Sequence, residues 1–347
     1  MRPSLQRVIA ALAALVLAPP TVFPAVARTC DRPNPVLTRN FPDPDLLKVG
    51  TTFYAFATNG QASDGGDANV QVAVSKDLVN WTEPSRLRDA LPDLPAWARR
   101  GWTWAPEVAA RPDGMGYVMY FTARDGRGRP GAVANRQCIG VASSKTMDEP
   151  FRPVGDRPLV CPFPHGAIDA STYREDDRLY LLWKVDGNCC TAPTPIYLRE
   201  LTADGLRFKA KSKTRLIDWS EPWEGRVVEA PMLWKANGRY WLFYSASHWD
   251  RAPDGSASTY AIAYAASDRL EGPYEKGGRL LGQSIDGRAL DGPGGQDAIL
   301  GPDGRGWFAY HAWSAGGRSL HLDFLDWQQG KPIIVPRCAP SAIPTPR

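Results

Sequence analysis

The apolar positions of this chain fall into short strand-like segments rather than at helical spacing. One segment type, with a tyrosine or tryptophan near its centre, occurs five times: TTFYAFAT, GYVMYFTAR, RLYLLWK, RYWLFYSA and GWFAYHAW. Most copies follow a polar turn, such as Asn237-Gly238, and most are followed by another apolar strand. Short apolar strands bounded by turn residues predict an all-β fold.

The five copies are evenly spaced along the chain. Their central aromatic residues, which lie 60 to 67 positions apart, are Tyr54, Tyr117, Tyr180, Tyr240 and Trp307. Strand, turn, strand, loop and strand, repeated at this period, are typical of a propeller blade. We therefore predict a five-bladed β-propeller, since a two-sheet sandwich would show less regular periods and would leave sheet edges to protect.

Each repeat also places one carboxylate 10 or 11 residues before its aromatic marker. These carboxylates are Asp43, Glu107, Asp169, Glu229 and Asp297. The first strand of a propeller blade lines the central channel, so we expect the five to ring one end of that channel. Burying carboxylates that repel one another costs free energy and shifts their pKa values, so five in register indicate chemistry.

Clustered carboxylates suit two tasks, which are binding a hard cation and cleaving a glycosidic bond. The chain has no compact calcium-binding loop, and we interpret Asp64-Gly65-Gly66-Asp67 as a solvated turn. Glycoside hydrolysis needs one carboxylate kept ionised as a base and another kept protonated as an acid, with a third to separate their pKa values.

The N-terminal residues have the features of an export signal. Arg2 and Arg7 precede an apolar run that is too short to span a membrane, and the small-x-small site Ala25-Val26-Ala27 follows. We predict a signal peptide at residues 1–27 and one propeller domain at residues 28–347. No other stretch is apolar enough to cross a bilayer, so we expect a secreted protein, extracellular or periplasmic, without membrane contact.

Charge and cysteine content narrow the picture further. The formal net charge is only +4 and Lys and Arg are not clustered, so we do not expect nucleic-acid binding. Six cysteines in an exported chain favour disulfides over a zinc site, because no CxxC is present. Cys30 and Cys338 are predicted to tie the chain ends together. Cys138, Cys161, Cys189 and Cys190 leave several pairings open. A bridge between the adjacent pair would be strained, so we expect Cys189 and Cys190 to have separate partners.

The acidic motifs together resemble glycoside hydrolase family 43 over about residues 34–336. The motifs are FPDPDLLKVG, WTWAPEV, GAIDASTY, VVEAPMLWKANGRYWLFYSA and GPGGQDAIL with YHAW. The resemblance implies a five-bladed propeller that hydrolyses arabinan, arabinoxylan, xylan or galactan with inversion. It also implies that Asp43 is the general base, that Glu229 is the general acid, and that Asp169 orients the acid and modulates its pKa.

These implied roles agree with the local sequence. Glu229 lies among Val227, Val228 and small apolar residues, so burial is expected to raise its pKa, and ionised Asp169 nearby is expected to raise it further. Asp43 must stay ionised to activate water. We assign lesser roles to Asp297 and Glu107 and interpret Glu107 as a structural or rim residue.

One motif departs from the family pattern. Many members have a histidine after the glycines of the last blade motif, where this chain has Gly295 followed by Gln296. We therefore expect no metal and no cofactor, and we expect Gln296 to hold water. His311 could replace the missing histidine or could be a packed core residue.

Candidate sugar contacts are less sharply defined. The aromatic candidates for stacking on a sugar face are Trp104, Trp102, Phe41 and Trp249. Arg318, His248 and Gln296 are polar candidates, and the DGNCC loop at residues 186–190 is expected at the same face.

We predict a monomeric exo-acting α-L-arabinofuranosidase that acts on arabinan or arabinoxylan. The alternatives are a β-xylosidase, an endo-arabinanase or an exo-galactanase of the same family, and a carbohydrate-binding propeller without activity.

Overall fold

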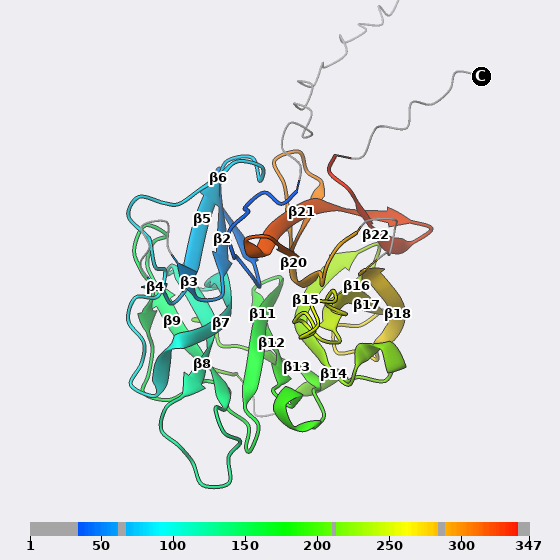
Figure 1. Ribbon diagram of the computed structural model, residues 1–347. Helices are drawn as coiled ribbons and strands as arrows, with labels where there is room; N and C mark the ends of the chain where they lie inside the picture. Colours follow the sequence, from blue (N-terminus) through cyan, green and yellow to red (C-terminus); the bar gives the residue numbers. More distant parts are fainter. Residues whose placement is uncertain (1–33, 62–66, 210–212, 284–288, 339–347) are drawn as a thin grey trace, which may run out of the picture.

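The five predicted blades are present in the computed structural model (Figure 1), which describes residues 34–61, 67–209, 213–283 and 289–338. Each blade is one antiparallel four-stranded sheet, and its strands follow one another in chain order. The signal peptide, Cys30 and the turn at Asp64 lie outside the described residues. Within the described part of the chain, no helix has the length and apolar character needed to span a membrane.

Blades 1 and 2 are built from residues 45–82 and 98–153. Blade 1 contains β1 (Asp45–Val49), β2 (Thr52–Ala57), β5 (Gln71–Ser75) and β6 (Trp81–Thr82). Blade 2 contains β7 (Ala98–Ala110), β8 (Tyr117–Asp125), β9 (Gln137–Ser144) and β10 (Arg152–Pro153). The small hairpin of β3 (Gly60–Gln61) and β4 (Asp67–Ala68) lies between β2 and β5 in the chain and forms a separate two-stranded sheet.

Blades 3 to 5 follow the same order. Blade 3 contains β11 (Ala167–Glu175), β12 (Arg178–Val185), β13 (Ile196–Glu200) and β14 (Thr214–Ile217). Blade 4 contains β15 (Val228–Ala236), β16 (Arg239–Ala246), β17 (Ala261–Ser267) and β18 (Glu275–Leu281). Blade 5 contains β19 (Gly294–Leu300), β20 (Gly306–Ser314), β21 (Gly317–Gln328) and β22 (Lys331–Val335). Two 3₁₀ helices, η2 (Asn188–Cys190) and η3 (Pro222–Glu224), lie in loops.

The sequence pattern predicted three strands in each blade and missed the fourth. The outermost strands β6 and β10 have only two residues each, and β10 includes a proline. Such short edge strands carry almost no periodic signal, and their shortness and the proline limit pairing with other sheets.

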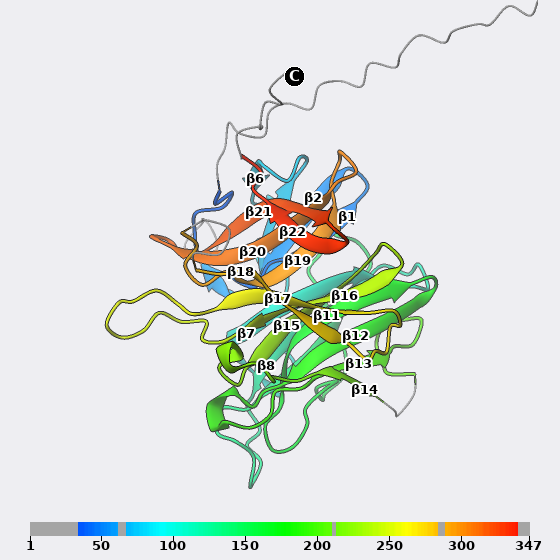
Figure 2. The ribbon, with the colours of Figure 1, turned by 90° about the vertical axis from the view of Figure 1, so that its right-hand side faces the viewer.

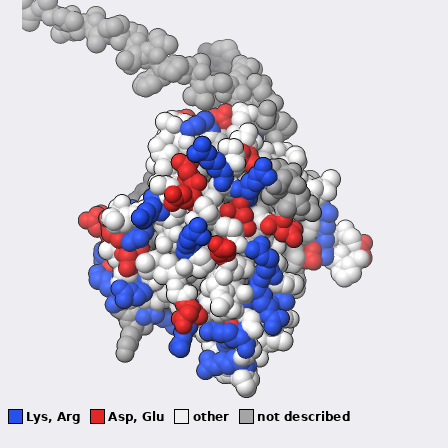
Figure 3. Space-filling model, turned by 90° about the vertical axis from the view of Figure 1, so that its left-hand side faces the viewer, with Lys and Arg blue, Asp and Glu red and all other residues white. Residues whose placement is uncertain are grey.

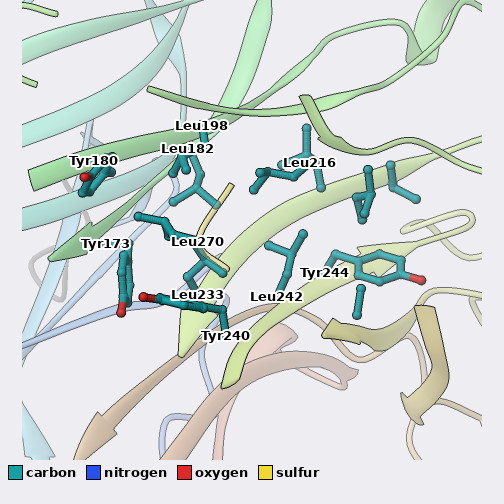
Figure 4. Close-up of a cluster of buried hydrophobic side chains, with 14 of the residues drawn as sticks. Tyr173, Tyr180, Leu182, Leu198, Leu216, Leu233, Tyr240, Leu242, Tyr244 and Leu270 are labelled. Atoms are coloured by element: carbon teal, nitrogen blue, oxygen red, sulfur yellow. The ribbon is translucent and has the colours of Figure 1, made fainter. Parts of the chain in front are cut away.

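The hydrophobic core is divided among the five interfaces between neighbouring blades. The cluster between blades 3 and 4 contains Leu182 and Leu198 from one side and Leu233, Leu242 and Tyr244 from the other (Figure 4). Four further clusters occupy the other interfaces, including the one between blade 5 and blade 1. Burial on both faces of each sheet explains why the middle strands are nearly continuous apolar runs.

The ring is closed by hydrogen bonds between the N-terminal segment and β21. Leu37 and Leu320 form a β-bridge, and the Asn34 side chain bonds both the N–H and the C=O of Leu322 at 2.9 and 3.1 Å. Blades 1 and 5 consequently lie side by side in Figures 1 and 2, where they are blue and orange to red. The Cys30–Cys338 bridge stays a prediction, because Cys30 is not described.

Two disulfides are present among the described residues, and one contradicts an expectation. Cys138 pairs with Cys161, whose neighbour Val160 forms a β-bridge with Ile139 and so brings the two sulfurs together. Cys189 pairs with Cys190, although adjacent cysteines were expected to take separate partners. The reason is local, since both lie on one turn of η2 and the buried Cys138 is already paired.

On the face shown in Figure 3, basic and acidic side chains are interspersed rather than separated.

Candidate active site

The innermost strands share a backbone feature that shapes the channel. At the same place in each blade, one residue has a positive φ between 39° and 57°; these residues are Asp43, Ala105, Asp169, Ala230 and Gly295. In blades 2 to 5 the strand register also shifts there, which marks a β-bulge. A bulge re-aims the side chains beside it. Positive φ is uncommon for residues other than glycine, and such strain concentrates at functional sites.

The bulges divide the five acids into two layers, so the expected single ring of carboxylates is wrong. Asp169 is itself a bulge residue, Glu229 immediately precedes one, and Asp43 has the matching positive φ just before β1. Glu107 and Asp297 each lie two positions beyond the positive-φ residue of their strand, and Asp45 lies two positions beyond Asp43. We call Asp43, Asp169 and Glu229 the upper acids, and Asp45, Glu107 and Asp297 the lower acids.

The Asp43 carboxylate is held by polar partners from two blades. Thr58 donates its hydroxyl to Oδ2 at 2.6 Å, and a guanidinium nitrogen of Arg318 lies 3.5 Å from Oδ1. His311 Nδ1 lies 3.4 Å from the same oxygen and accepts the Asp43 backbone N–H at 3.0 Å. Burial and Arg318 lower the pKa of His311 well below its usual value, so the imidazole is neutral.

The Glu229 carboxylate accepts three hydrogen bonds. Lys184 and Asn188 each donate to Oε2 at 2.9 Å, and the Tyr260 hydroxyl donates to Oε1 at 2.7 Å. Lys184 is fully buried and also donates to the Asn188 side-chain oxygen. Burial alone would raise the pKa of Glu229, but Lys184 and the two neutral donors outweigh it and lower the pKa.

Asp169 lies beside Glu229 and carries the opposite shift. Its Oδ2 accepts the Ala230 backbone N–H at 2.9 Å. Burial, reinforced by the negative charge of Glu229, raises the pKa of Asp169 to about 8. The sequence-based expectation of a raised pKa at Glu229 beside an ionised Asp169 is therefore wrong for the free protein. Together the two carboxyl groups hold one proton near neutral pH.

The lower acids join neighbouring blades. Asp45 accepts the Val108 N–H at 2.9 Å, Glu107 accepts the Thr172 N–H at 2.8 Å, and Asp297 accepts the Leu46 N–H at 2.7 Å. Each bond runs from the inner strand of one blade to that of the next, in agreement with a structural interpretation of Glu107. Burial raises the pKa of all three, which for Asp297 reaches about 8.

Replacing Asp297 by asparagine is expected to stabilise the protein at pH 8. The folded pKa of about 8 exceeds the unfolded value of about 3.9, so the native state binds more protons and stability is lost as pH rises between these values. Asparagine stays neutral and keeps an oxygen for the Leu46 N–H. Urea unfolding should show Asp297→Asn more stable than the wild type by at least about 1 kcal/mol at pH 8, with a smaller difference at pH 4.

The matched control is Asp268→Asn, because the Asp268 side chain is 79% exposed. It should leave the pH dependence of stability unchanged. An Asp297→Asn variant with the same slope as the wild type would contradict the buried-proton interpretation.

A narrow cavity of about 40 Å³ on the channel axis touches both layers of acids. Its walls include Asp43 and Asp169 of the upper acids and Asp45, Glu107 and Asp297 of the lower acids. Such a volume admits water but no sugar ring. A substrate must therefore bind above the channel, against the loops that surround the upper acids.

Aromatic and basic side chains gather at two places, one on β7 and β8 and the other on the loop between β16 and β17. Trp102 is 41% exposed, packs edge-on against Trp104 with ring centroids 6.2 Å apart, and carries the Arg124 guanidinium 3.5 Å from its centroid. Trp249 is 43% exposed and lies next to exposed His248. Arg318 connects Trp249 to the site, because it lies over that ring at 4.7 Å and also contacts Asp43.

Two predicted sugar contacts are wrong. Phe41 is fully buried in the core between blades 5 and 1, so it offers no face to a ligand. Gln296 is 5% exposed, accepts a hydrogen bond from Ser245 and donates to the Ala230 carbonyl. It therefore braces the bulge of β15, with one hydrogen-bond partner at each end of its amide.

Sequence reasoning missed Lys184, Tyr260 and Thr58, and it expected the loop at residues 186–190 at this face without singling out Asn188. Lys184 had a visible signal, since a lysine ends the apolar run RLYLLWK on a middle strand where burial is expected. The other three are common polar residues in loops or at strand ends, and only the fold brings them to the carboxylates.

The arrangement around Gly295 does not fit a histidine-bound metal. A Cβ at Gly295 would lie 2.7 Å from His311 Nδ1 and 2.8 Å from Asp43 Oδ1, so the imidazole occupies the space beside this glycine. Because Nδ1 accepts the Asp43 N–H, the proton of neutral His311 is on Nε2, and neither nitrogen has a free lone pair. Among the described residues, the two other possible ligand groups, one around Cys138 and one around Cys189, contain disulfide sulfurs instead of thiolates.

The comparisons with known proteins agree with this geometry. Residues 32–332 match the family model described as glycosyl hydrolases family 43. The chain is 26% identical to a β-D-galactofuranosidase of Aspergillus niger, over 80% of this chain and 75% of the relative. It is 29% identical to an extracellular endo-α-(1→5)-L-arabinanase of Bacillus subtilis, over 84% and 86% of the two chains.

Two further similarities extend over most of the chain. An extracellular exo-α-(1→5)-L-arabinofuranosidase of Cellvibrio japonicus is 26% identical, over 83% of this chain and 85% of the relative. Among solved structures, a thermostable family-43 glycoside hydrolase has a TM-score of 0.71 and 25% identity, and the match covers 91% of this chain and 98% of that one.

Proposed function

Because the chain belongs to glycosyl hydrolase family 43, whose members cleave glycosidic bonds with inversion, we propose that it is a secreted, exo-acting α-L-arabinofuranosidase of arabinan or arabinoxylan. The observation that carries the proposal is the set of three upper acids at one narrow channel. Asp43 has one set of polar partners, and Glu229 and Asp169 have another. A propeller that only binds carbohydrate has no need of these buried and mutually coupled carboxyl groups.

Asp43 is the proposed general base. The Thr58 hydroxyl and the Arg318 guanidinium hold its carboxylate in place, where it can take a proton from an attacking water. Water can reach the carboxylate, because Asp43 lines the axial cavity.

Glu229 is the proposed general acid, and Asp169 is its proton-sharing partner. The pair holds one proton up to about pH 8, the pKa of Asp169. When a glycosidic oxygen displaces donors from Glu229, the carboxylate loses stabilisation and the proton of the pair moves to it. Glu229 then delivers this proton to the leaving group.

The names of the relatives support a furanoside substrate. Two of them are named for arabinan or arabinofuranoside, and the third is named for galactofuranoside, which is also a five-membered ring sugar. Two of the three are named as extracellular, which supports export of this chain.

Exo action is supported by a wall beside the upper acids. The loop between β16 and β17 projects from blade 4 (Figure 2), and its Trp249 stacks on Trp313 with ring centroids 6.3 Å apart. Arg318 ties this wall to Asp43. A wall at one end of a cleft admits a chain terminus and blocks a continuing chain.

The test is product analysis from linear α-1,5-arabinan, together with a panel of nitrophenyl glycosides. An exo-arabinofuranosidase releases arabinose alone from the first time point, and NMR should show the β-anomer first, since the enzyme inverts an α-linkage. A ladder of arabino-oligosaccharides would indicate an endo-arabinanase. Preferential release of xylose would indicate a xylosidase, and no hydrolysis of any substrate would indicate a binding protein.

A further inference from the structure

The turn that follows β12 combines an exposed disulfide with a contact to the upper acids. Lys184 lies near the end of β12, and η2 begins four residues later with Asn188. Asn188, Cys189 and Cys190 are all solvent-exposed and occupy consecutive positions. The Cys189–Cys190 bridge therefore directly follows Asn188, whose side chain contacts Glu229.

Asn188 is the member of this turn that reaches the carboxylate. Its amide nitrogen donates to Glu229 Oε2 at 2.9 Å, and its oxygen accepts from Lys184. Lys184 donates to the same Glu229 oxygen at 2.9 Å. The three side chains therefore form a closed triangle, in which Asn188 fixes the orientation of both charged groups.

The buried and exposed corners of this triangle differ in how firmly they are held. Lys184 is fully buried and Glu229 is 5% exposed, so packing limits the movement of both side chains and leaves Asn188 to set how their polar ends meet. Asn188 projects from an exposed turn, where a side chain has many alternative rotamers and water competes for its hydrogen bonds. Something in the turn must hold Asn188 in place.

Backbone hydrogen bonds already fix part of this turn. The Gly187 carbonyl accepts the N–H groups of Cys190 and Ala192 at 3.1 and 3.2 Å, and Thr191 has a left-handed φ of 52°. Gly187 itself has no space for a side chain, because a Cβ would lie 2.5 Å from the Ala192 carbonyl oxygen. These contacts fix the start and the end of the turn.

A disulfide between adjacent residues closes a small ring that includes the peptide bond between them. The ring restricts the backbone angles on both sides of that peptide. Asn188 is the residue immediately before the ring, so its position is restricted as well. We propose that the Cys189–Cys190 disulfide is a positioning element for the general acid, which holds the Asn188 amide between Lys184 and Glu229. This proposal rests on the assignment of Glu229 as the acid.

The experiment compares Cys189→Ala/Cys190→Ala with the wild type, on the substrate of the panel that the wild type hydrolyses fastest. Loss of the ring should lower kcat/KM by about 10-fold or more, mainly through kcat, because a misplaced acid affects the chemical step. The basic limb of the pH profile should move to higher pH. Glu229 loses a donor that stabilises its ionised form, so the pair keeps its proton longer.

A double-mutant cycle shows whether the disulfide acts through Asn188. Asn188→Ala alone should reproduce both effects, and removal of the disulfide in the Asn188→Ala background should then cost nothing more. Additive losses would overturn the proposal.

The second disulfide of the chain offers a matched control. Cys138 is fully buried in blade 2 and its bridge has no contact with the upper acids among the described residues, so Cys138→Ala/Cys161→Ala should lower stability without moving the pH profile. The proposal is overturned if the control shifts the profile as much as the Cys189→Ala/Cys190→Ala variant does, or if the latter keeps the wild-type profile and kcat.

Mild reduction tests the same point without a substitution. Dithiothreitol gives two electrons and two protons to an exposed disulfide and itself closes to a cyclic disulfide. Cys189 and Cys190 are exposed, whereas Cys138 is not. Reduced protein whose two new thiols are confirmed by mass spectrometry should show the same upward shift of the basic limb, and an unchanged limb would overturn the proposal. An inactive wild type would instead refute the proposed function.

Discussion

Glu229→Ala is expected to lower kcat/KM by about 10³-fold on an arabino-oligosaccharide, while an aryl glycoside with a good leaving group loses far less. General acid–base catalysis contributes roughly 10²- to 10⁴-fold, and a poor leaving group needs all of that proton transfer. A nitrophenolate leaves without protonation, so its departure does not require the acid. Steady-state kinetics on both substrates measure the difference.

Asp43→Ala is the matched variant, because it removes a carboxylate from the same layer of the channel. It should lose activity by a similar factor on both substrates, since activation of the attacking water does not depend on the leaving group. Circular dichroism should show both variants folded. Equal losses on good and poor leaving groups for Glu229→Ala would remove its assignment as the acid.

The fold could be predicted because the signal for it is repeated. Every middle strand carries an aromatic residue in an apolar run, and the five runs recur at nearly constant spacing. The core has the same repetition, with one cluster at each interface between blades. Among the missed outermost strands, β6 and β10 have only two residues each and so have no periodicity to detect.

The division of the acids into two layers could not be predicted from spacing. Glu107 and Asp169 lie at nearly the same distance from their aromatic markers, yet Asp169 is a bulge residue and Glu107 lies two positions beyond one. A shift of one residue moves a side chain to the other face of a strand. Because each bulge inserts a residue, counting along the sequence cannot place a carboxylate in its layer.

The pKa values of the upper acids depend on partners that are distant in the sequence. The apolar neighbours of Glu229 correctly predicted its burial, and burial does act to raise its pKa. Lys184 lies 45 positions away and reverses the outcome. Asp169 was predicted to be the ionised residue of the Asp169–Glu229 pair, but it holds the proton instead, with a pKa of about 8. The local sequence predicts that Glu229 is desolvated, but it does not predict that the charge of Lys184 compensates for this desolvation.

Lys184→Met is expected to destabilise the protein by about 3–5 kcal/mol at pH 8, which is the usual cost of removing one partner from a buried ion pair. Lys184 is fully buried against Glu229, so the variant leaves a buried carboxylate without its cation. Urea unfolding at several pH values measures the loss. The expected loss is smaller near pH 4, where a protonated Glu229 needs no cation.

The sign of this pH dependence follows from the two folded-state pKa values. In the wild type the pKa of Glu229 is lowered, so the stability it contributes is present above the unfolded value of about 4.3 and is lost as pH falls below it. Without Lys184, burial raises the pKa, so the variant loses stability as pH rises above the same value. The free energies of unfolding of the wild type and of Lys184→Met therefore diverge from about pH 4 upward.

Lys184→Met/Glu229→Gln separates the charge effect from the effect of packing. Glutamine has almost the same shape as glutamate but carries no charge to leave uncompensated. Its oxygen can accept from Asn188, and its NH2 group can donate to the Tyr260 hydroxyl oxygen. The double variant should recover most of the stability that Lys184→Met loses at pH 8 and should show no pH-dependent divergence from Glu229→Gln. If it stays as unstable as Lys184→Met at every pH, Lys184 contributes through packing, and the buried ion pair does not account for the lowered pKa of Glu229.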